Sequence, residues 1–330
     1  MAHGGSGTAT VRLLESVFLP HFHHPELRRL HDGALLPATP GPLAFTTDSH
    51  VVRPLEFPGG DIAQLAVHGT ANDLAMCGAE PRWLSAAFIL EEGFPQQTLA
   101  RLAASLARAA EEAGMDLVAA DTKVVEHGKG DGLYISTSGI GIVRAPQPVG
   151  PQAIRPGDAV LVSGDIGRHG MAIMAAREDS GFDTSLASDC APVWPAVKGL
   201  LDAGIPVHAL RDCTRGGLAT VLIELAESSA LTITLVDNAI PVSGPVRAAC
   251  EILGLDPLYA ACEGRFVAIV PEEYAAEALS ILNHINISRD ACLIGHVGPA
   301  RPGTFVQLSQ ALGTLRALDR LSGVQLPRIC

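Results

Sequence analysis

Aspartates recur where the sequence predicts a strand end, a glycine turn, a helix start or a small-residue helix face. These residues are Asp32, Asp48, Asp73, Asp121, Asp165 and Asp212. Carboxylates at strand ends meet at one rim of an α/β sheet, where ligand sites form. Such oxygens suit Mg²⁺, which usually arrives with a nucleoside triphosphate. Ordinary turns and helix caps are the alternative, because aspartate favours both.

Three further features could carry chemistry. The segment Thr214-Arg-Gly-Gly217 is typical of a helix start that accepts an anion, because glycines let a phosphate approach bare N–H groups. An ordinary capped helix is the alternative. Lys123 follows Asp121 by two residues, so both could face one cleft, although a lone lysine is commonly a surface residue. Glu263 precedes a predicted strand, and a partly buried glutamate would have a raised pKa and could act as a base.

Cys330 is the last of seven cysteines and the final residue of the sequence. The sequence has no C-x-x-C pair, so it gives no sign of a zinc ribbon or a thioredoxin motif. A thiol on a flexible arm can carry a thioester-like or thiocarbamate group into a site, whereas the alternative is an inert, exposed thiol. Pro327 favours an extended approach to the last three residues. The other six cysteines are interpreted as reduced packing residues.

Strands and helices are predicted to alternate in both halves of the sequence, which indicates an α/β or α+β fold. Strands are expected over 43–52, 82–90, 117–120, 133–143, 159–162, 231–236, 266–270, 292–297 and 304–308. Helices are expected over 61–77, 98–113, 272–282 and 315–321, and after the segment 212–217. In this pattern Asp121 comes directly after a strand, and Asp61 is the N-cap of the first helix.

A cluster of prolines marks the expected domain boundary, at positions 146, 148, 151 and 156. At roughly 150 residues per domain, a chain of 330 residues is long enough for two domains. The expected division is a flexible glycine-rich segment over 1–40, a domain over 41–150, a second domain over 151–314 and a mobile tail over 315–330.

The charge balance limits the classes of partner. Lys and Arg number 23 against 35 Asp and Glu, so the formal net charge is −12. A nucleic-acid binder would need a basic face, so no nucleic-acid partner is expected. No run reaches the roughly 18 apolar residues of a membrane span, and the first residues show no apolar secretory segment. We therefore expect a cytoplasmic protein with no membrane partner.

Several motifs together closely resemble one known family. They are Thr46-Thr-Asp-Ser-His-Val-Val52, Phe57-Pro-Gly-Gly-Asp-Ile62, Gly69-Thr-Ala-Asn-Asp-Leu-Ala-Met76, Asp121-Thr-Lys-Val-Val125, Arg211-Asp-Cys-Thr-Arg-Gly-Gly-Leu-Ala219 and Pro327-Arg-Ile-Cys330. The sequence resembles the HypE family of hydrogenase maturation factors, within the ATP-binding, PurM-like superfamily of aminoimidazole ribonucleotide synthetase. Thiamine-monophosphate kinase and selenophosphate synthetase share the general layout, and the final Pro-Arg-Ile-Cys separates HypE from them.

The resemblance implies a fold and a reaction. The fold is a two-domain PurM-like α/β (α+β) fold, in which the N-terminal domain pairs its sheet with that of a second subunit to form a homodimer. In the reaction, the carbamoyltransferase HypF places a carbamoyl group on the terminal cysteine, here Cys330. The HypE protein then uses ATP and Mg²⁺ to dehydrate this S-carboxamide to a thiocyanate. The cyanide passes to iron on the HypC–HypD complex, for [NiFe] hydrogenase.

The resemblance also implies site residues. Those for the nucleotide are Asp48, Asn72, Asp73, Asp121, Thr122, Asp212, Thr214, Gly216 and Gly217, and those for the metal are Asp32, Asp48, Asp73 and Asp121. Lys123 and Glu263 match a lysine and a glutamate of the family's tunnel, so they are the candidate base and charge-stabilising group, acting on the modified Cys330. Three positions depart from the family pattern, namely Ala120 where glycine is usual, Cys213 where proline is usual, and Cys262 where a small residue without a thiol is expected.

Two other functions are compatible with the sequence. A small-molecule phosphotransferase of the same superfamily would use ATP and leave Cys330 idle. A non-catalytic carrier would only present the tail cysteine to its partners, and loss of Asp121 or Lys123 would then be harmless.

Overall fold

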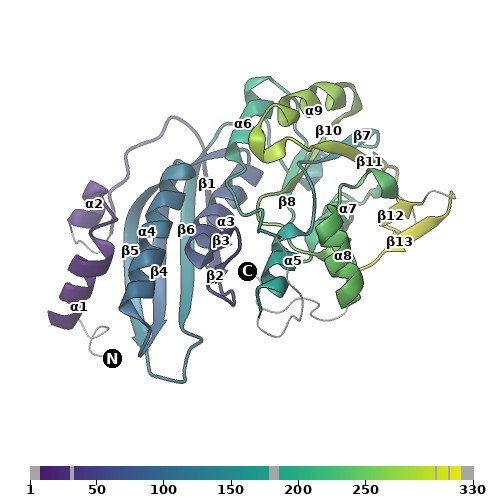
Figure 1. The fold of residues 1–330 in the computed structure, drawn as a ribbon. Coiled ribbons are helices and arrows are strands. Elements are labelled where there is room, and N and C mark those ends of the chain that lie inside the picture. Colours follow the sequence, from purple (N-terminus) through teal and green to yellow (C-terminus); the bar gives the residue numbers. More distant parts are fainter. Residues whose placement is uncertain (1–7, 30–32, 178–185, 302, 311–312, 321–330) are drawn as a thin grey trace.

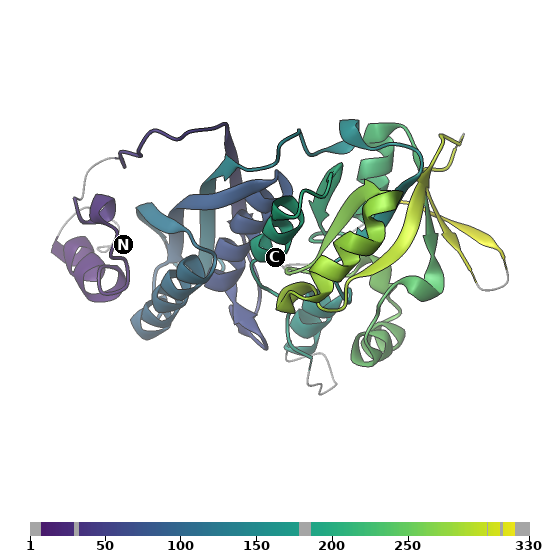
Figure 2. The same ribbon diagram turned by 90° about the horizontal axis from the view of Figure 1, so that it is seen from above.

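The computed structural model describes residues 8–29, 33–177, 186–301, 303–310 and 313–320. Each half of the chain contains one large β-sheet with helices packed on it, and the two halves lie side by side (Figure 1). Seen from above, the N-terminal half in purple and blue and the C-terminal half in green and yellow form two bodies (Figure 2). The predicted two-domain α/β fold is therefore confirmed.

The N-terminal sheet has the strand order β1-β6-β4-β5. Its strands are β1 (Leu43–His50), β4 (Ala79–Glu91), β5 (Asp116–Val125) and β6 (Leu133–Val143), with a short hairpin of β2 (Glu56–Phe57) and β3 (Gly60–Asp61). Burial alternates along β6, so Leu133 and Ile135 face the core while Tyr134 between them is half-buried. Helices α3 (Ile62–Met76) and α4 (Gln96–Glu112) pack on each other and cover the buried face.

The other side of this sheet, which we call the open sheet face, carries Leu43, Phe45, Ile89, Tyr134 and Ile140. Phe45 pairs with Ile140 across β1 and β6, and Ile89 pairs with Tyr134 across β4 and β6. The Phe45 side chain is 68% exposed. Large apolar side chains gathered on one exposed face are typical of an interaction surface.

The N-terminal segment folds against the first domain. It forms α1 (Thr8–Leu13), a π-helix (Leu14–Phe18) and α2 (Pro25–Arg28). Leu13, Val17, Phe18 and Phe22 are buried in the core of the N-terminal domain, and the Phe18 ring lies 5.0 Å from that of Phe88. The prediction of a flexible segment over 1–40 is therefore wrong for residues 8–28, because their apolar side chains supply part of the core.

The C-terminal sheet has the strand order β13-β12-β9-β11-β7-β10-β8. These strands are β7 (Asp158–Val162), β8 (Ala209–Asp212), β9 (Thr232–Val236), β10 (Phe266–Pro271), β11 (Cys292–Gly298), β12 (Val306–Ser309) and β13 (Leu315–Leu318). The helices are α5 (Arg168–Ala175), α6 (Trp194–Asp202), α7 (Gly217–Ser229), α8 (Gly244–Leu253) and α9 (Ala275–Asn283). Short 3-10 turns cover Pro151–Ala153, Asp237–Ala239, Pro257–Tyr259, Glu272–Tyr274 and Asn286–Ser288. Helix α7 packs on one face of the sheet, and α6 and α9 pack on the other.

Helix α3 connects the two domains. One side packs on β1, β4 and β6, and its C-terminal half contacts β8 and α6 of the second domain. Nearly all of its side chains are buried, including Ala75 and Met76, which join an apolar cluster of the C-terminal domain. A helix that is apolar on every side is typical of a buried position. Helix α3 therefore contributes side chains to the apolar clusters of both domains.

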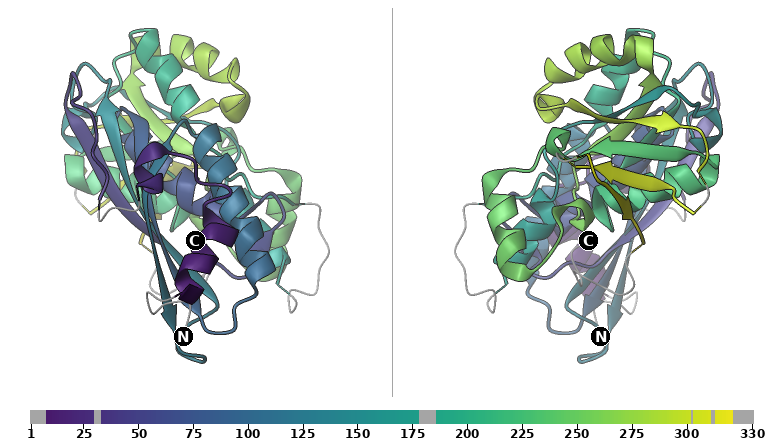
Figure 3. Two further views of the ribbon diagram at one scale, coloured as in Figure 1. Left: turned by 90° about the vertical axis from the view of Figure 1, so that its left-hand side faces the viewer. Right: turned by 90° about the vertical axis from the view of Figure 1, so that its right-hand side faces the viewer.

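Two predicted elements differ from the structure. The strand expected over 117–120 continues to Val125, because Asp121–Lys123 pair with Ala87–Ile89 of β4. Asp121 therefore lies within a strand and not after its end. The helix expected over 315–321 is also wrong, since Leu315–Leu318 form β13, which pairs antiparallel with β12 at the sheet edge (Figure 3, right).

The chain remains attached to the domain beyond β13. The Tyr259 hydroxyl donates a 2.8 Å hydrogen bond to the Asp319 carbonyl oxygen, and Arg320 lies 2.6 Å from Glu227. The predicted mobile tail therefore cannot begin at residue 315. Residues 321–330, including Cys330, lie outside the described part of the chain. Among the helices that are described, none is long and apolar enough to cross a membrane.

Candidate active site

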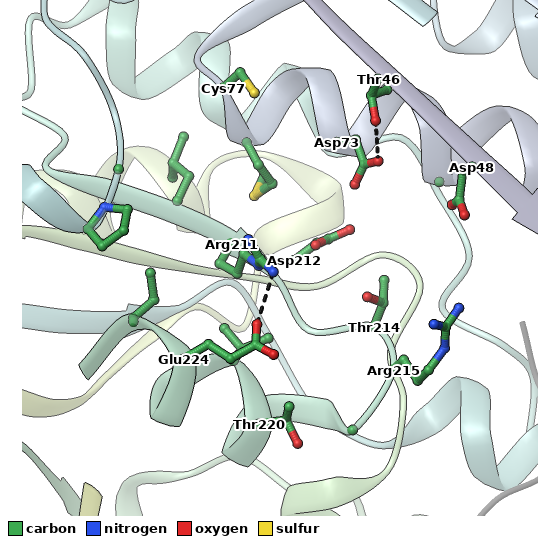
Figure 4. Close-up of a pocket in the computed structure, with 18 of the residues that line it drawn as sticks. Thr46, Asp48, Asp73, Cys77, Arg211, Asp212, Thr214, Arg215, Thr220 and Glu224 are labelled. Carbon is green, nitrogen blue, oxygen red and sulfur yellow. Dashed lines mark hydrogen bonds and ion pairs between the residues drawn. The ribbon is translucent and has the colours of Figure 1, made fainter. Parts of the chain in front are cut away.

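A pocket of about 1190 Å³ lies between the two domains. Residues of β1 and α3 line one side, and residues of β8 and α7 line the other (Figure 4). The predicted site residues that line it are Asp48, Asp73, Asp212, Thr214, Gly216 and Glu263. The fold thus brings together predicted residues that are far apart in the sequence.

Asp48 and Asp73 come from β1 and α3, which approach each other closely here. The approach depends on Gly69, because a Cβ atom there would lie 3.0 Å from His50 Nε2 and 3.4 Å from Asp48 Oδ2. Asp73 lies one turn further along α3 and accepts a 2.8 Å hydrogen bond from the Thr46 hydroxyl. The strand and the helix therefore present two carboxylates to the same pocket.

The three pocket aspartates differ in proton affinity. Burial, together with the negative charge of Asp73, raises the pKa of Asp212 to about 7. Burial also raises the pKa of Asp73, and the charge of Asp48 adds to this effect. For Asp48, burial acts in the same direction, but the hydrogen bond and charge of His50 bring its pKa below the ordinary value. A cation in the pocket would favour the ionised form of all three.

Asp212 should make the stability of the protein depend on pH. Its raised pKa contributes stability that is complete below the pKa of an unfolded aspartate and is lost as pH rises through about 7. We expect Asp212→Asn to gain about 2 kcal/mol in unfolding free energy, relative to the wild type, between about pH 5.5 and pH 8. Urea unfolding at both pH values, with a chelator and without nucleotide, measures this gain. An unfolding free energy that changes with pH by the same amount in Asp212→Asn and in the wild type would contradict this prediction.

A glycine turn joins β8 to α7 at the pocket wall. Gly216 and Gly217 have φ angles of 82° and 62°, in the left-handed region that favours glycine. A Cβ atom on Gly217 would lie 2.6 Å from the Ala260 carbonyl oxygen, so only glycine fits there. Gly217 thus packs against the backbone near Ala260, on the side of the turn away from the pocket, whereas Thr214 and Gly216 line the pocket. The predicted helix start is confirmed, since α7 begins at Gly217, and the N-terminus of a helix suits an anion.

Glu263 is a buried residue of the pocket wall, with 4% of its surface exposed. Its Oε1 atom has no hydrogen-bond partner within the described part of the chain. Burial raises its pKa well above the ordinary value, and the charges of Asp212 and Asp189 add to the rise. Once it has lost its proton, a carboxylate in such surroundings is a strong base.

Some predicted residues lie elsewhere. Asp121, Thr122 and Lys123 are on β5, at the opposite edge of the sheet from β1. Asp121 and Lys123 pair with Ala87 and Ile89 and share the open sheet face. Three strand spacings, or about 14 Å, separate them from β1 within one subunit. Asp32 and Cys330 lie outside the described residues.

Asn72 also lies away from the pocket. It is buried in α3, and its side chain bonds to backbone groups of the C-terminal domain. The structure therefore gives no support to Asn72 as a nucleotide ligand.

Three arginines line the pocket and were not predicted as site residues, namely Arg211, Arg215 and Arg320. Arg211 forms a 3.0 Å ion pair with Glu224, and both line the pocket (Figure 4). The charge of Arg215 acts to lower the pKa of Asp48 and of Glu263, so it lies near both carboxyl groups. The signal was present in the segment 211–217, because guanidinium groups beside a glycine-rich helix start favour phosphate binding.

The pocket offers carboxylate ligands to a hard cation such as Mg²⁺, but they do not form a complete coordination shell. Within the described residues, no three His, Cys, Asp or Glu side chains form a ready-made metal site. Asp48, Asp73 and Asp212 nevertheless line the same pocket, where burial and, after it, the negative charge of a neighbouring carboxylate raise the pKa values of the last two, so this excess of negative charge has no counter-ion among the three. A divalent cation would relieve this excess, and Mg²⁺ commonly takes a few carboxylates and completes its shell with phosphate and water.

Comparison with known proteins places this fold and pocket in a class. The family described as AIR synthase related protein, N-terminal domain, matches residues 30–143. The corresponding C-terminal domain family matches residues 155–307. The fold and the site thus define a member of the AIR synthase related proteins.

Individual relatives narrow the class. Carbamoyl dehydratase HypE of Azotobacter vinelandii is 49% identical over 330 residues, which cover 100% of this chain and 96% of that protein. A crystal structure of hydrogenase maturation protein HypE in complex with ATP has a TM-score of 0.95 at 45% identity, covering 100% of this chain and 99% of the other. A HypE–HypF complex has a TM-score of 0.82 at 45% identity, covering 94% and 99%. The chain belongs to the HypE family of hydrogenase maturation proteins.

Proposed function

We propose that this protein is an ATP-dependent carbamoyl dehydratase. It converts the S-carboxamide on its own Cys330 to a thiocyanate, which supplies the cyanide ligands of the [NiFe]-hydrogenase iron. The observation that carries the proposal is that one pocket combines an acidic, glycine-rich wall suited to a metal-bound triphosphate with the buried carboxyl of Glu263. The similarity to a carbamoyl dehydratase, and to a HypE protein whose crystal structure is a complex with ATP, supports the proposal.

The proposed reaction uses ATP to remove the amide oxygen. The oxygen of the S-carboxamide attacks the γ-phosphorus of ATP, and ADP leaves. The C–O bond then breaks with phosphate as the leaving group, and loss of both N–H protons completes the carbon–nitrogen triple bond. The carboxamide thereby loses the elements of water, which appear in ADP and phosphate. Phosphorylation is required because an unmodified amide oxygen is a poor leaving group.

Different residues of this chain bind the phosphates, hold the metal, accept the proton and stabilise charge in the proposed reaction. The turn at Thr214 and Gly216 and the guanidinium of Arg215 hold the phosphates. Mg²⁺, held by Asp48 and Asp73 with Asp212 beside them, would neutralise negative charge on the transferring phosphoryl group. Glu263 accepts an N–H proton from the substrate. Lys123 stabilises the charge that develops on the reacting group.

The open sheet face supports a homodimer. Phe45 and its apolar neighbours would leave water when two such faces meet. Asp121, Thr122 and Lys123 lie on β5 and have no place in the pocket of their own subunit. Facing sheets would let β5 of one subunit approach β1 of the other, so the homodimer would complete both active sites.

The same reaction defines the other partners. HypF is proposed as the donor of the carbamoyl group, which is supported by the similarity to a HypE–HypF complex. The HypC–HypD complex is proposed as the cyanide acceptor. A cytoplasmic location and the absence of nucleic-acid and membrane partners remain predictions.

Intact-mass measurement tests the proposed function. The purified protein is incubated with a HypF-type carbamoyl donor system, first without ATP and then with ATP and Mg²⁺. We expect a gain of one carbamoyl group, followed by an ATP-dependent loss of one water, both mapped to Cys330. Cys330→Ala should show neither change. ATP turnover without any change in protein mass would favour a small-molecule phosphotransferase, and no ATP turnover would favour a carrier.

A further inference from the structure

Asn72 of α3 is 2% exposed and uses its side-chain amide to connect the two domains. Its Nδ2 group donates hydrogen bonds to the Ala191 carbonyl oxygen at 3.1 Å and to the Glu263 carbonyl oxygen at 3.2 Å. Its Oδ1 atom accepts a 2.8 Å bond from the Val193 N–H. Two acceptors and one donor fix the orientation of the amide. Both N–H groups are thereby used, so neither is available to a nucleotide.

The loop that contains Glu263 is held from other directions as well. The Glu263 N–H donates a 3.2 Å hydrogen bond to Asp189 Oδ1. At Gly264, a Cβ atom would lie 1.9 Å from the Asp189 carbonyl oxygen, so the loop presses closely on the segment 189–193. Arg265 donates hydrogen bonds to Asp165 and to the Gly264 and Ile287 carbonyl oxygens. The hydrogen bond from Asn72 to the Glu263 carbonyl oxygen connects this loop to the N-terminal domain.

We propose that Asn72 is a positioning residue that sets the backbone of Glu263 relative to α3, and that it is not a nucleotide ligand. The inference rests on the proposed function, in which Glu263 accepts a substrate proton. Asp73 follows Asn72 directly, so the same helix places a carboxylate on the phosphate side of the pocket and holds the loop of the base. A base displaced by even about 1 Å can lose about 10²-fold in rate.

The test compares three variants of the full-length carbamoylated protein. Asn72→Asp keeps the acceptor for Val193 but turns a carboxylate toward two carbonyl oxygens, and Asn72→Ala removes the amide if the first variant folds poorly. Thr70→Val is the matched control, because Thr70 is buried in the same helix and bonds to Thr137 within the N-terminal domain. The readouts are single-turnover thiocyanate formation at saturating ATP, the Kd for ATP, and amide hydrogen exchange over 190–193 and 262–265.

In both Asn72 variants we expect a rate about 10–100-fold lower, with a Kd for ATP within about 3-fold of the wild type. Exchange over 190–193 and 262–265 should increase in these variants and not in Thr70→Val. Unchanged exchange, or an unchanged rate, would overturn the proposal. A weaker Kd with a normal rate at saturating ATP would also overturn it and would make Asn72 a nucleotide ligand. A normal rate in Glu263→Gln would instead refute the base of the proposed function, while exchange would still decide whether Asn72 holds the loop.

Discussion

Replacing Glu263 by Gln is expected to slow thiocyanate formation by about 10²–10⁴-fold, the usual contribution of a general base. The variant keeps the size and shape of the side chain but cannot accept the N–H proton. ATP binding should be nearly unchanged, because the phosphate side of the pocket is built from other residues, such as Asp73 and Thr214. Single-turnover conversion of the carbamoylated protein, followed by intact mass, measures the rate.

The pH dependence gives a second readout of the same variant. Burial raises the pKa of Glu263 well above the ordinary value, and the wild-type rate should therefore rise with pH as this carboxyl group loses its proton. The Gln variant should lose this slope. Asp158→Asn is the control for loss of a buried carboxylate, since Asp158 bonds to His208 and does not line the pocket. A wild-type rate and slope in Glu263→Gln would exclude Glu263 as the base.

Local sequence patterns predicted most of the elements that build this pocket. Asp61 was expected to cap α3, and its Oδ1 atom accepts bonds from the Ala63 and Gln64 N–H groups at 2.8 and 2.9 Å. On α4, which agrees with the helix expected over 98–113, Leu99, Leu102, Leu106 and Ala110 are buried at helical spacing. Caps and helical stripes are decided by neighbours in the sequence, so they can be read without the fold.

The errors have a different origin, because they depend on pairing between distant segments. Asp121 looks like the residue after a strand, yet pairing with β4 extends β5 past it. Residues 315–318 have no strong strand pattern in their sequence, and they form a strand because they pair with β12. Asn72 lies in a motif that suggests a ligand, and only contacts with residues 191, 193 and 263 show where its amide points. Such long-range contacts override local preference.

The position of Lys123 leads to the second large expected effect, which concerns the proposed homodimer. If one site needs Lys123 from one subunit and Glu263 from the other, Lys123→Ala and Glu263→Gln should each be nearly inactive alone. In a mixed dimer, one site would combine the intact Glu263 of the first variant with the intact Lys123 of the second and would be active. The other site would carry both substitutions. Random subunit exchange between equal amounts makes about half of the dimers mixed, which should restore about one quarter of wild-type activity.

The alternative arrangement predicts a different result. If Lys123 and Glu263 of the same chain worked together, every site of a mixed dimer would carry one defect, and mixing would restore nothing. The structure favours the first arrangement, because β5 lies at the opposite sheet edge from β1, whose Asp48 shares the pocket with Glu263. Mixing two samples of the same variant controls for exchange itself. Activity that stays at the level of the separate variants, although mass spectrometry shows mixed dimers, would place Lys123 in the site of its own subunit.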